Sequence, residues 1–192
     1  MNLKRTILLI TSIVLVVALL VMVLAFGKQA QLKIGDKIDS LNQVNVYYNG
    51  SMGNVSGRNV VNGYNLGLKY QCVEFVKRYY YEVYEHKMPN SYGHAKDFYN
   101  KKVKDGQLNK GRNLKQYSNP SKTKPKVGDL VVFDGHIFNK YGHVAIVSDV
   151  NNNKVELIQQ NVGKTSRVKF SLVHHNGKWK IAHERILGFL RK

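Results

Sequence analysis

The sequence has one cysteine, Cys72, in 192 residues, so no disulfide can form within the chain. Exported proteins usually carry their cysteines in pairs or lack them. A lone cysteine is either a buried apolar side chain or a reactive thiol. Composition alone favours the buried side chain, so the residues around Cys72 have to decide between the two.

Acidic residues are also scarce: 12 Asp and Glu stand against 30 Lys and Arg, which gives a formal net charge of +18. This excess of positive charge favours anionic partners, namely nucleic acid, a membrane surface or an acidic polymer such as a bacterial cell wall. The sequence lacks zinc-finger, helix-turn-helix and RRM-like signatures. Nucleic acid is therefore the least favoured of the three partners.

Recognisable metal and cofactor motifs are missing as well. The seven histidines have neither HExxH nor paired Cys/His zinc spacing, and the glycines of residues 50–67 form neither GxGxxG nor a P-loop. The spacing of the carboxylates singles out no pair for glycoside cleavage. We therefore expect no metal and no cofactor.

One long apolar run, residues 7–26, is interrupted only by two hydroxyl side chains. Its length matches a helix that crosses the core of a bilayer. Lys4 and Arg5 precede it and predict an N-terminus on the cytoplasmic side. We therefore predict an uncleaved single-pass anchor, and a cleaved signal peptide with a secreted product is the alternative. The predicted division is an anchor at residues 1–27, a linker at residues 28–43 and an extracytoplasmic domain at residues 44–192.

Hydrophobic periodicity predicts helices and strands within this domain. Apolar side chains recur at three- and four-residue spacing over residues 71–85, which is typical of an amphipathic helix. A shorter helix is predicted at residues 95–103, and residues 106–126 are predicted to be a basic loop. Helices followed by an antiparallel sheet indicate the α+β class. Strands are predicted at residues 44–48, 130–133, 143–150, 155–160, 168–173, 179–183 and 186–190.

Cys72 falls in the first turn of the helix predicted at residues 71–85. Unpaired backbone N–H groups and the positive end of the helix dipole lie at that point. Both favour a thiolate over a thiol, so we predict a lowered pKa and a nucleophilic sulfur. The backbone N–H of Cys72 could also bind an oxyanion.

A thiol nucleophile needs an imidazole to take its proton, and that imidazole needs a polar group to orient it. His143 begins a predicted strand and shares a face with every second residue after it. If Val150 pairs with Lys154 across the next turn, Gln159 and Asn161 fall on this same face. A shift of one residue removes both from it. The alternative for His143 is a solvated histidine at a strand end.

Five segments carry a family resemblance in their order along the chain. They are YQCVEFVKR (70–78), GHAKDF (93–98), PKVGDLVVF (125–133), GHVAIV (142–147) and QQNV (159–162). The set resembles CHAP domains, the cysteine, histidine-dependent amidohydrolases/peptidases. The resemblance is greatest to the amidase half of bifunctional glutathionylspermidine synthetase/amidases, through residues 64–78, 153–155, 159–161 and 186–189.

The resemblance implies a papain-like fold of the NlpC/P60 clan, in which the nucleophile helix packs on an antiparallel sheet. It implies a cysteine hydrolase that cuts C–N bonds through a thioester acyl-enzyme. Cys72 is then the nucleophile and His143 the base, and Gln159 or Asn161 orients the imidazole. The expected substrate is an amide bond in bacterial peptidoglycan, with the basic surface holding anionic wall polymer.

The sequence departs from the family at Gln159, where CHAP domains usually have Glu. Glutamine can still accept the imidazole N–H, but it lacks the charge that stabilises an imidazolium. We therefore expect lower activity or reliance on Asn161. Two alternatives stay open: an amidase acting on a glutathione–polyamine conjugate, and a catalytically weak or inactive cell-wall-binding module.

Overall fold

The computed structural model of the chain describes residues 2–26 and 31–192. It divides into two compact units, Met1–Leu32 and Lys33–Lys192. The larger unit contains the core of the protein and all of the candidate site residues. Each unit is described by itself below.

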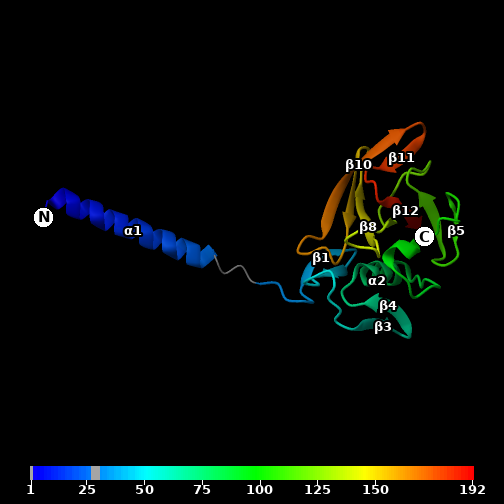
Figure 1. Cartoon of the computed structure of the whole chain (residues 1–192), viewed down its shortest axis with the longest axis horizontal. Coiled ribbons are helices and arrows are strands. Elements are labelled where there is room, and N and C mark those ends of the chain that lie inside the picture. The colour runs from blue at the N-terminus through cyan, green and yellow to red at the C-terminus, as the bar shows by residue number, and fades with distance from the viewer. Residues whose placement is uncertain (1, 27–30) are drawn as a thin grey trace. The chain divides into compact units, whose positions relative to one another are not determined.

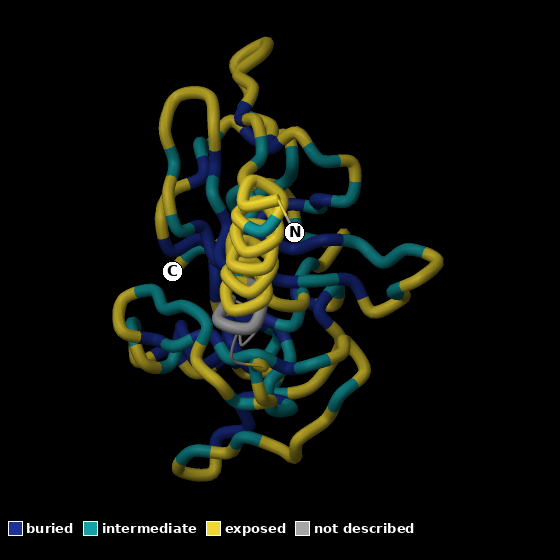
Figure 2. Tube along the Cα trace, turned by 90° about the vertical axis from the view of Figure 1, so that its left-hand side faces the viewer, coloured by how far each residue is buried: buried dark blue, intermediate teal, exposed yellow. Residues whose placement is uncertain are grey.

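The first unit contains the helix α1, Leu3–Phe26, which is 24 residues long. The hydroxyl groups of Thr11 and Ser12 donate to backbone carbonyls one turn earlier, so both polar side chains are satisfied within the helix. Figure 2 shows this helix exposed along almost all of the length whose burial is described, with only Thr6 in the intermediate class. Its length and composition would allow it to cross a membrane, and a signal sequence has the same properties.

The second unit is built on an eight-stranded antiparallel sheet with the strand order β11-β10-β9-β8-β7-β12-β6-β5 (Figure 1). The unit is therefore α+β, as the sequence predicts. The strands of this sheet are β5 Gln107–Asn109, β6 Leu114–Ser118, β7 Leu130–Phe133, β8 His143–Val150, β9 Lys154–Ile158, β10 Arg167–His175, β11 Lys178–Ile181 and β12 Ile186–Arg191.

Two small antiparallel sheets and two helical segments complete the unit. The helix α2 packs against β2, β4 and β8. The helix therefore lies between the large sheet and strands of the two small sheets. The elements are β1 Lys37–Leu41 with β2 Val44–Tyr47, β3 Arg58–Val61 with β4 Tyr64–Leu68, the helix α2 Cys72–Tyr84 and the 3₁₀ helix η1 Ala95–Phe98.

The central strands β7 and β8 are buried on both faces, which explains their nearly continuous apolar sequence. Alternate side chains divide the core into two clusters. One cluster lies between the sheet and α2 and includes Val132, Val144 and Ile146. The other lies on the opposite face and includes Phe133 and Ala145.

The sequence predictions differ from the structure outside these central elements. The strand β1 occupies part of the predicted linker at residues 28–43, and the compact unit begins at Lys33. The second helix is shorter than predicted, since only Ala95–Phe98 are helical. The segment predicted as a loop, residues 106–126, contains the strands β5 and β6. The inward-facing side chains of β6, such as Leu114 and Gln116, are buried, and this burial stabilises the strand.

Candidate active site

Cys72 is the first residue of α2 and Gln71 is its N-cap, with extended backbone angles of φ −80° and ψ 162°. The helix therefore starts where the sequence predicts, and the backbone N–H of Cys72 has no partner within the helix. The Cys72 side chain is only 9% exposed. Burial raises the pKa of the thiol to about 11, although backbone hydrogen bonds from Val144, Val73 and Cys72 itself act in the opposite direction. The predicted lowering of this pKa is wrong because desolvation outweighs the helix terminus.

A buried polar network fixes the start of α2 from the inside of the domain. The side-chain amide of Gln160 donates to the backbone carbonyl of Gln71 at 3.1 Å and to Glu74 at 2.9 Å. Its oxygen accepts the backbone N–H of Tyr47 in β2 at 2.8 Å. Glu74 is in turn paired with Arg78 one turn later, at 2.7 Å. Since Gln160 is fully buried, these bonds join the segment that follows β9 to the strand β2 and to the start of α2.

His143 is the first residue of β8 and pairs with Phe133 at the end of β7. Gly142 directly before it has φ +74°, in the left-handed region. A Cβ atom at Gly142 would lie 2.5 Å from the carbonyl oxygen of Phe133 and 2.9 Å from Cβ of Lys96. Glycine is therefore needed here so that η1 can lie directly against the residues that lead into His143.

The register of β8 and β9 brings Gln159 onto the face of His143. Beside the turn, Val150 pairs with Val155 rather than with Lys154, so the predicted pairing is wrong there. A bulge between Val147 and Asp149 then shifts the register by one residue. On the side of the bulge nearer His143, Val147 pairs with Leu157 and Ile146 with Ile158, which is the register that the sequence predicts.

Gln159 holds the imidazole of His143 in place. The distance between Nε2 of His143 and Oε1 of Gln159 is 3.0 Å. Because Oε1 can only accept, Nε2 carries the proton and the unprotonated nitrogen of a neutral ring is Nδ1. Burial lowers the pKa of His143 to about 4. The hydrogen bond that His143 donates to Gln159 opposes this shift, and the charge of Arg185 adds to it. The ring is therefore neutral and has a free acceptor at neutral pH.

The Cys72 thiol lies beside the start of β8, the strand that begins with His143. The Cys72 thiol lies within hydrogen-bonding reach of the backbone of Val144, the residue that follows His143. Within residues 31–192, as far as the structure describes them, no hydrogen bond links the thiol to the imidazole itself. Catalytic hydrogen bonds are often long in ligand-free enzymes and shorten when substrate binds.

Asn161 is hydrogen-bonded to Gln71, the residue before Cys72, and not to His143. Its side chain donates to the carbonyl of Met52 at 3.1 Å and to the side-chain oxygen of Gln71. Its own oxygen accepts from Asn49 at 2.8 Å. Of the two predicted orienters, Gln159 thus contacts the imidazole, whereas Asn161 ties a loop to the residue before Cys72.

The sequence gives no prediction for Gln160 or Gln71, although both are part of this arrangement. A signal for Gln160 is present, because consecutive residues of a strand point to opposite faces. If Gln159 faces His143, Gln160 has to face α2. A buried polar side chain at that position needs partners, and the start of the helix provides them.

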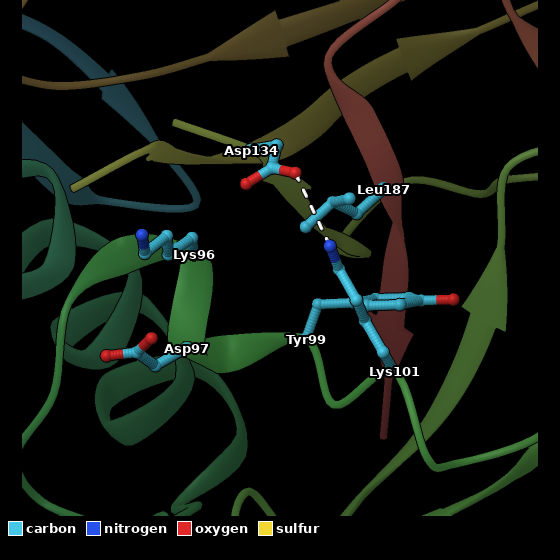
Figure 3. A pocket seen from close by; sticks show the side chains of 6 residues that line it. All are labelled: Lys96, Asp97, Tyr99, Lys101, Asp134 and Leu187. Atoms are coloured by element: carbon cyan, nitrogen blue, oxygen red, sulfur yellow. Dashed lines mark ion pairs between the residues drawn. The ribbon is translucent and has the colours of Figure 1, made fainter. Parts of the chain in front are cut away.

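A cavity of about 220 Å³ lies next to η1 and is lined by Lys96, Asp97, Tyr99, Lys101, Asp134 and Leu187 (Figure 3). Lys101 and Asp134 form an ion pair across it at 3.7 Å. Neither Cys72, His143 nor Gln159 lines this cavity. It adjoins the candidate site through Lys96, which is close to Gly142.

Metal chemistry has no candidate residues in the described part of the chain. Among residues 2–26 and 31–192, no group of three or more His, Cys, Asp or Glu side chains lies close enough to hold a metal ion. The chemistry available to the site is that of a thiol at a helix N-terminus and an imidazole oriented by an amide. Cysteine hydrolases use this combination.

A comparison with known protein families identifies the family of this chain. The CHAP domain model matches residues 62–161, which include Cys72, His143 and the residues that hold them. This match spans more than half of the chain, and the protein belongs to the CHAP domain family. Membership supports a hydrolase that acts on amide bonds.

Two curated relatives agree with this assignment. Trypanothione synthetase of Crithidia fasciculata is 28% identical over 120 residues, which is 60% of this chain and 18% of the relative. The bifunctional glutathionylspermidine synthetase/amidase of Escherichia coli (strain K12) is 31% identical over 107 residues, which is 55% of this chain and 17% of the relative. The similarity therefore covers less than a fifth of either relative.

Proposed function

We propose that this protein is a cysteine-dependent amidase or endopeptidase that cleaves amide bonds through a thioester on Cys72. The observation that carries the proposal is the hydrogen bond between His143 and Gln159, with the Cys72 thiol beside the backbone of the next residue, Val144, inside the segment that matches the CHAP domain. In the proposed papain-like fold, α2 supplies the nucleophile and β8 supplies the base.

The resting site holds a neutral thiol and a neutral imidazole, since the pKa of Cys72 is about 11 and that of His143 about 4. The sulfur is therefore activated during attack rather than before it. Nδ1 of His143 takes the thiol proton as sulfur adds to the amide carbonyl. The backbone N–H of Cys72 binds the oxyanion that forms.

Collapse of this intermediate breaks the C–N bond, and His143 returns the proton to the leaving amine. Water then attacks the thioester, with His143 again as the base, and frees the acid and the thiol. Gln159 keeps the ring in one tautomer throughout. It stabilises the imidazolium through a dipole rather than through a charge, which predicts a slower reaction than with a carboxylate.

The proposed substrate is an amide bond of bacterial peptidoglycan. Two features support it: the formal net charge of +18, and an apolar N-terminal helix that would hold the domain outside the cytoplasmic membrane. In this proposal the basic surface retains the enzyme on anionic wall polymer, and salt weakens that attraction.

A glutathione–polyamine amide is the second candidate, because a relative that shares 31% identity is named as a glutathionylspermidine synthetase/amidase. A wall-binding module without turnover is a third, because Gln159 lacks the charge of the family's usual Glu. Full-length protein should be incubated separately with purified walls and with the conjugate, and the released amines counted. Release from walls supports the proposal, release from the conjugate alone supports the second candidate, and binding without release supports the third.

A further inference from the structure

The hairpin between β7 and β8 ends in two large apolar side chains that project into solvent. Ile137 is 91% exposed and Phe138 is 85% exposed. Residues His136 and Asn139 on either side exchange two backbone hydrogen bonds of 2.9 Å each. The two apolar residues are therefore the central residues of a tight turn, where small polar residues and glycine are usual.

This hairpin has a fixed shape. The side chain of Asn139 donates to the carbonyl of Gly142 at 3.0 Å and accepts the backbone N–H of Tyr141 at 3.1 Å. The ring of His136 lies edge-on to that of Phe138 at 6.1 Å. Ile137 and Phe138 are thus held outward by the hairpin rather than exposed by local disorder, and a partner would meet a preformed tip.

The two side chains at the tip stand apart from the rest of the domain. Ile137 and Phe138 are almost fully exposed, and neither lines the cavity beside η1. A residue that selects a substrate side chain would be flanked by other side chains of the pocket. Two exposed apolar side chains at the tip of a turn are instead typical of a segment that inserts into an apolar layer.

The residues behind the tip have the character of a membrane interface. Tyr141 is 49% exposed, and the ammonium group of Lys140 lies 5.4 Å from the centre of its ring. Tyrosine and lysine are favoured at the level of lipid headgroups, where the ring is partly buried and the charge meets anionic lipid. The order from the tip inward is therefore apolar, then aromatic and cationic.

The chain can hold this tip close to a bilayer. Six residues separate Phe26 at the end of α1 from Lys33, where the second unit begins. Fully extended, a segment of that length spans at most about 22 Å. If α1 is a membrane anchor, this short connection keeps the second unit near the bilayer, and even a weak affinity of the tip for lipid is then sufficient.

We propose that Ile137 and Phe138 insert into the anionic phospholipid bilayer in which α1 anchors the chain. The inference rests on the proposed anchor and adds an orientation to the proposed function. His143 follows Phe138 by five residues, which corresponds to about 17 Å of extended chain. Insertion therefore holds the start of β8 close to the lipid headgroups and selects amide substrates that lie near the membrane surface.

The test uses the full-length chain in vesicles of phosphatidylcholine and phosphatidylglycerol that carry brominated acyl chains, which quench nearby tryptophan. Phe138→Trp places a probe at the tip, and native Trp179 gives the baseline in every sample. Val127→Trp is the matched control, because Val127 is 46% exposed and precedes β7, at the end of that strand opposite the tip. Flotation of the vesicles confirms that each variant is bound.

We expect the added fluorescence of Phe138→Trp to be quenched at least twofold more than that of Val127→Trp. Equal quenching, or failure of the chain to float with the vesicles, would overturn the proposal. So would a fluorescence change at position 138 that wall fragments cause and lipid does not, because the tip would then contact substrate.

The same vesicles can be assayed for amide hydrolysis, which separates this inference from the catalytic one. Turnover without selective quenching at position 138 overturns only the insertion. Selective quenching without turnover supports the insertion and counts against the amidase.

Discussion

Gln159 accepts a hydrogen bond of 3.0 Å from Nε2 of His143 through its side-chain oxygen. This contact fixes the tautomer of the ring and leaves Nδ1 free to act as the base in the proposed mechanism. A neutral amide, however, does not offset the burial that lowers the pKa of His143 to about 4. The predictions below follow from this neutral pair.

Replacing Gln159 by Glu should increase activity and raise the pKa of His143. A carboxylate beside the imidazole stabilises the imidazolium and moves its pKa upward by about 1–3 units. An NMR titration of the ring in a Cys72→Ala background, together with kcat against pH in the active protein, measures both effects. Gln159→Ala is the opposite variant and should lower kcat about 100-fold through loss of orientation. A faster Gln159→Ala enzyme would show that the contact has no positioning role.

The pH dependence of activity should have its acid limb well below the ordinary pKa of histidine. His143 becomes protonated only as pH falls towards about 4, so the base is available at every higher pH. The value of kcat/KM for the wild-type protein should therefore change little between pH 8 and pH 6 and should fall near pH 4. An acid limb near pH 6.5 in the wild type would contradict a neutral resting imidazole.

Alkylation of the thiol tests the other half of the pair. With a pKa of about 11, Cys72 should react with iodoacetamide roughly tenfold faster for each unit of pH between 7 and 10. Since Cys72 is the only cysteine, the mass of the intact protein reports the reaction directly. A rate that is high and constant from pH 5 to pH 8 would instead indicate a preformed thiolate–imidazolium pair.

Gln160 should matter for catalysis as well as for stability. Gln160→Ala leaves Glu74 and the carbonyl of Gln71 without their buried donor, which costs about 1–3 kcal/mol of stability. It also frees the start of α2, so kcat should fall about 100-fold. Denaturant unfolding and kcat measured on folded protein separate the two effects.

Gln116 offers the matched control for this substitution. It is also fully buried, and its amide bonds Asn100, Asn109 and Val103 in another part of the domain. Gln116→Ala should lose comparable stability and keep the wild-type kcat. Equal losses of kcat in both variants would mean that Gln160 acts only through the stability of the fold.

Gly142→Ala should displace His143. The new Cβ would meet the carbonyl of Phe133 and the side chain of Lys96, so the start of β8 has to shift and kcat should drop about 100-fold. Gly177→Ala is the control for backbone strain alone, because Gly177 has φ +69° with open space around it. If the two variants were equally active, close packing at Gly142 would have no part in placing the imidazole.

The sequence predicts the elements that carry the site well, for physical reasons. The bounds of β8 are predicted correctly because an apolar run follows a glycine and ends at an asparagine turn. α2 is predicted correctly to within a residue at each end because its apolar spacing is regular. Both elements are central, so burial dominates their residue pattern.

Peripheral elements were missed even where a signal was present. Asn62 and Gly63, with φ +48° and +73°, form the two-residue turn between β3 and β4. Asn-Gly is a strong hairpin signal, but the surrounding glycines and asparagines conceal it. The raised pKa of Cys72 could not be predicted locally, because it depends on the sheet that covers the thiol.

The central claim is that Cys72 carries the reaction, and amide turnover by wild type and Cys72→Ala under identical conditions tests it most directly. Amines released from walls and from a glutathione–polyamine amide are counted for both proteins. The proposed mechanism predicts release by the wild type and a loss of at least about 10³-fold in the variant. Equal release by the two proteins, or none by the wild type from either substrate, would contradict it.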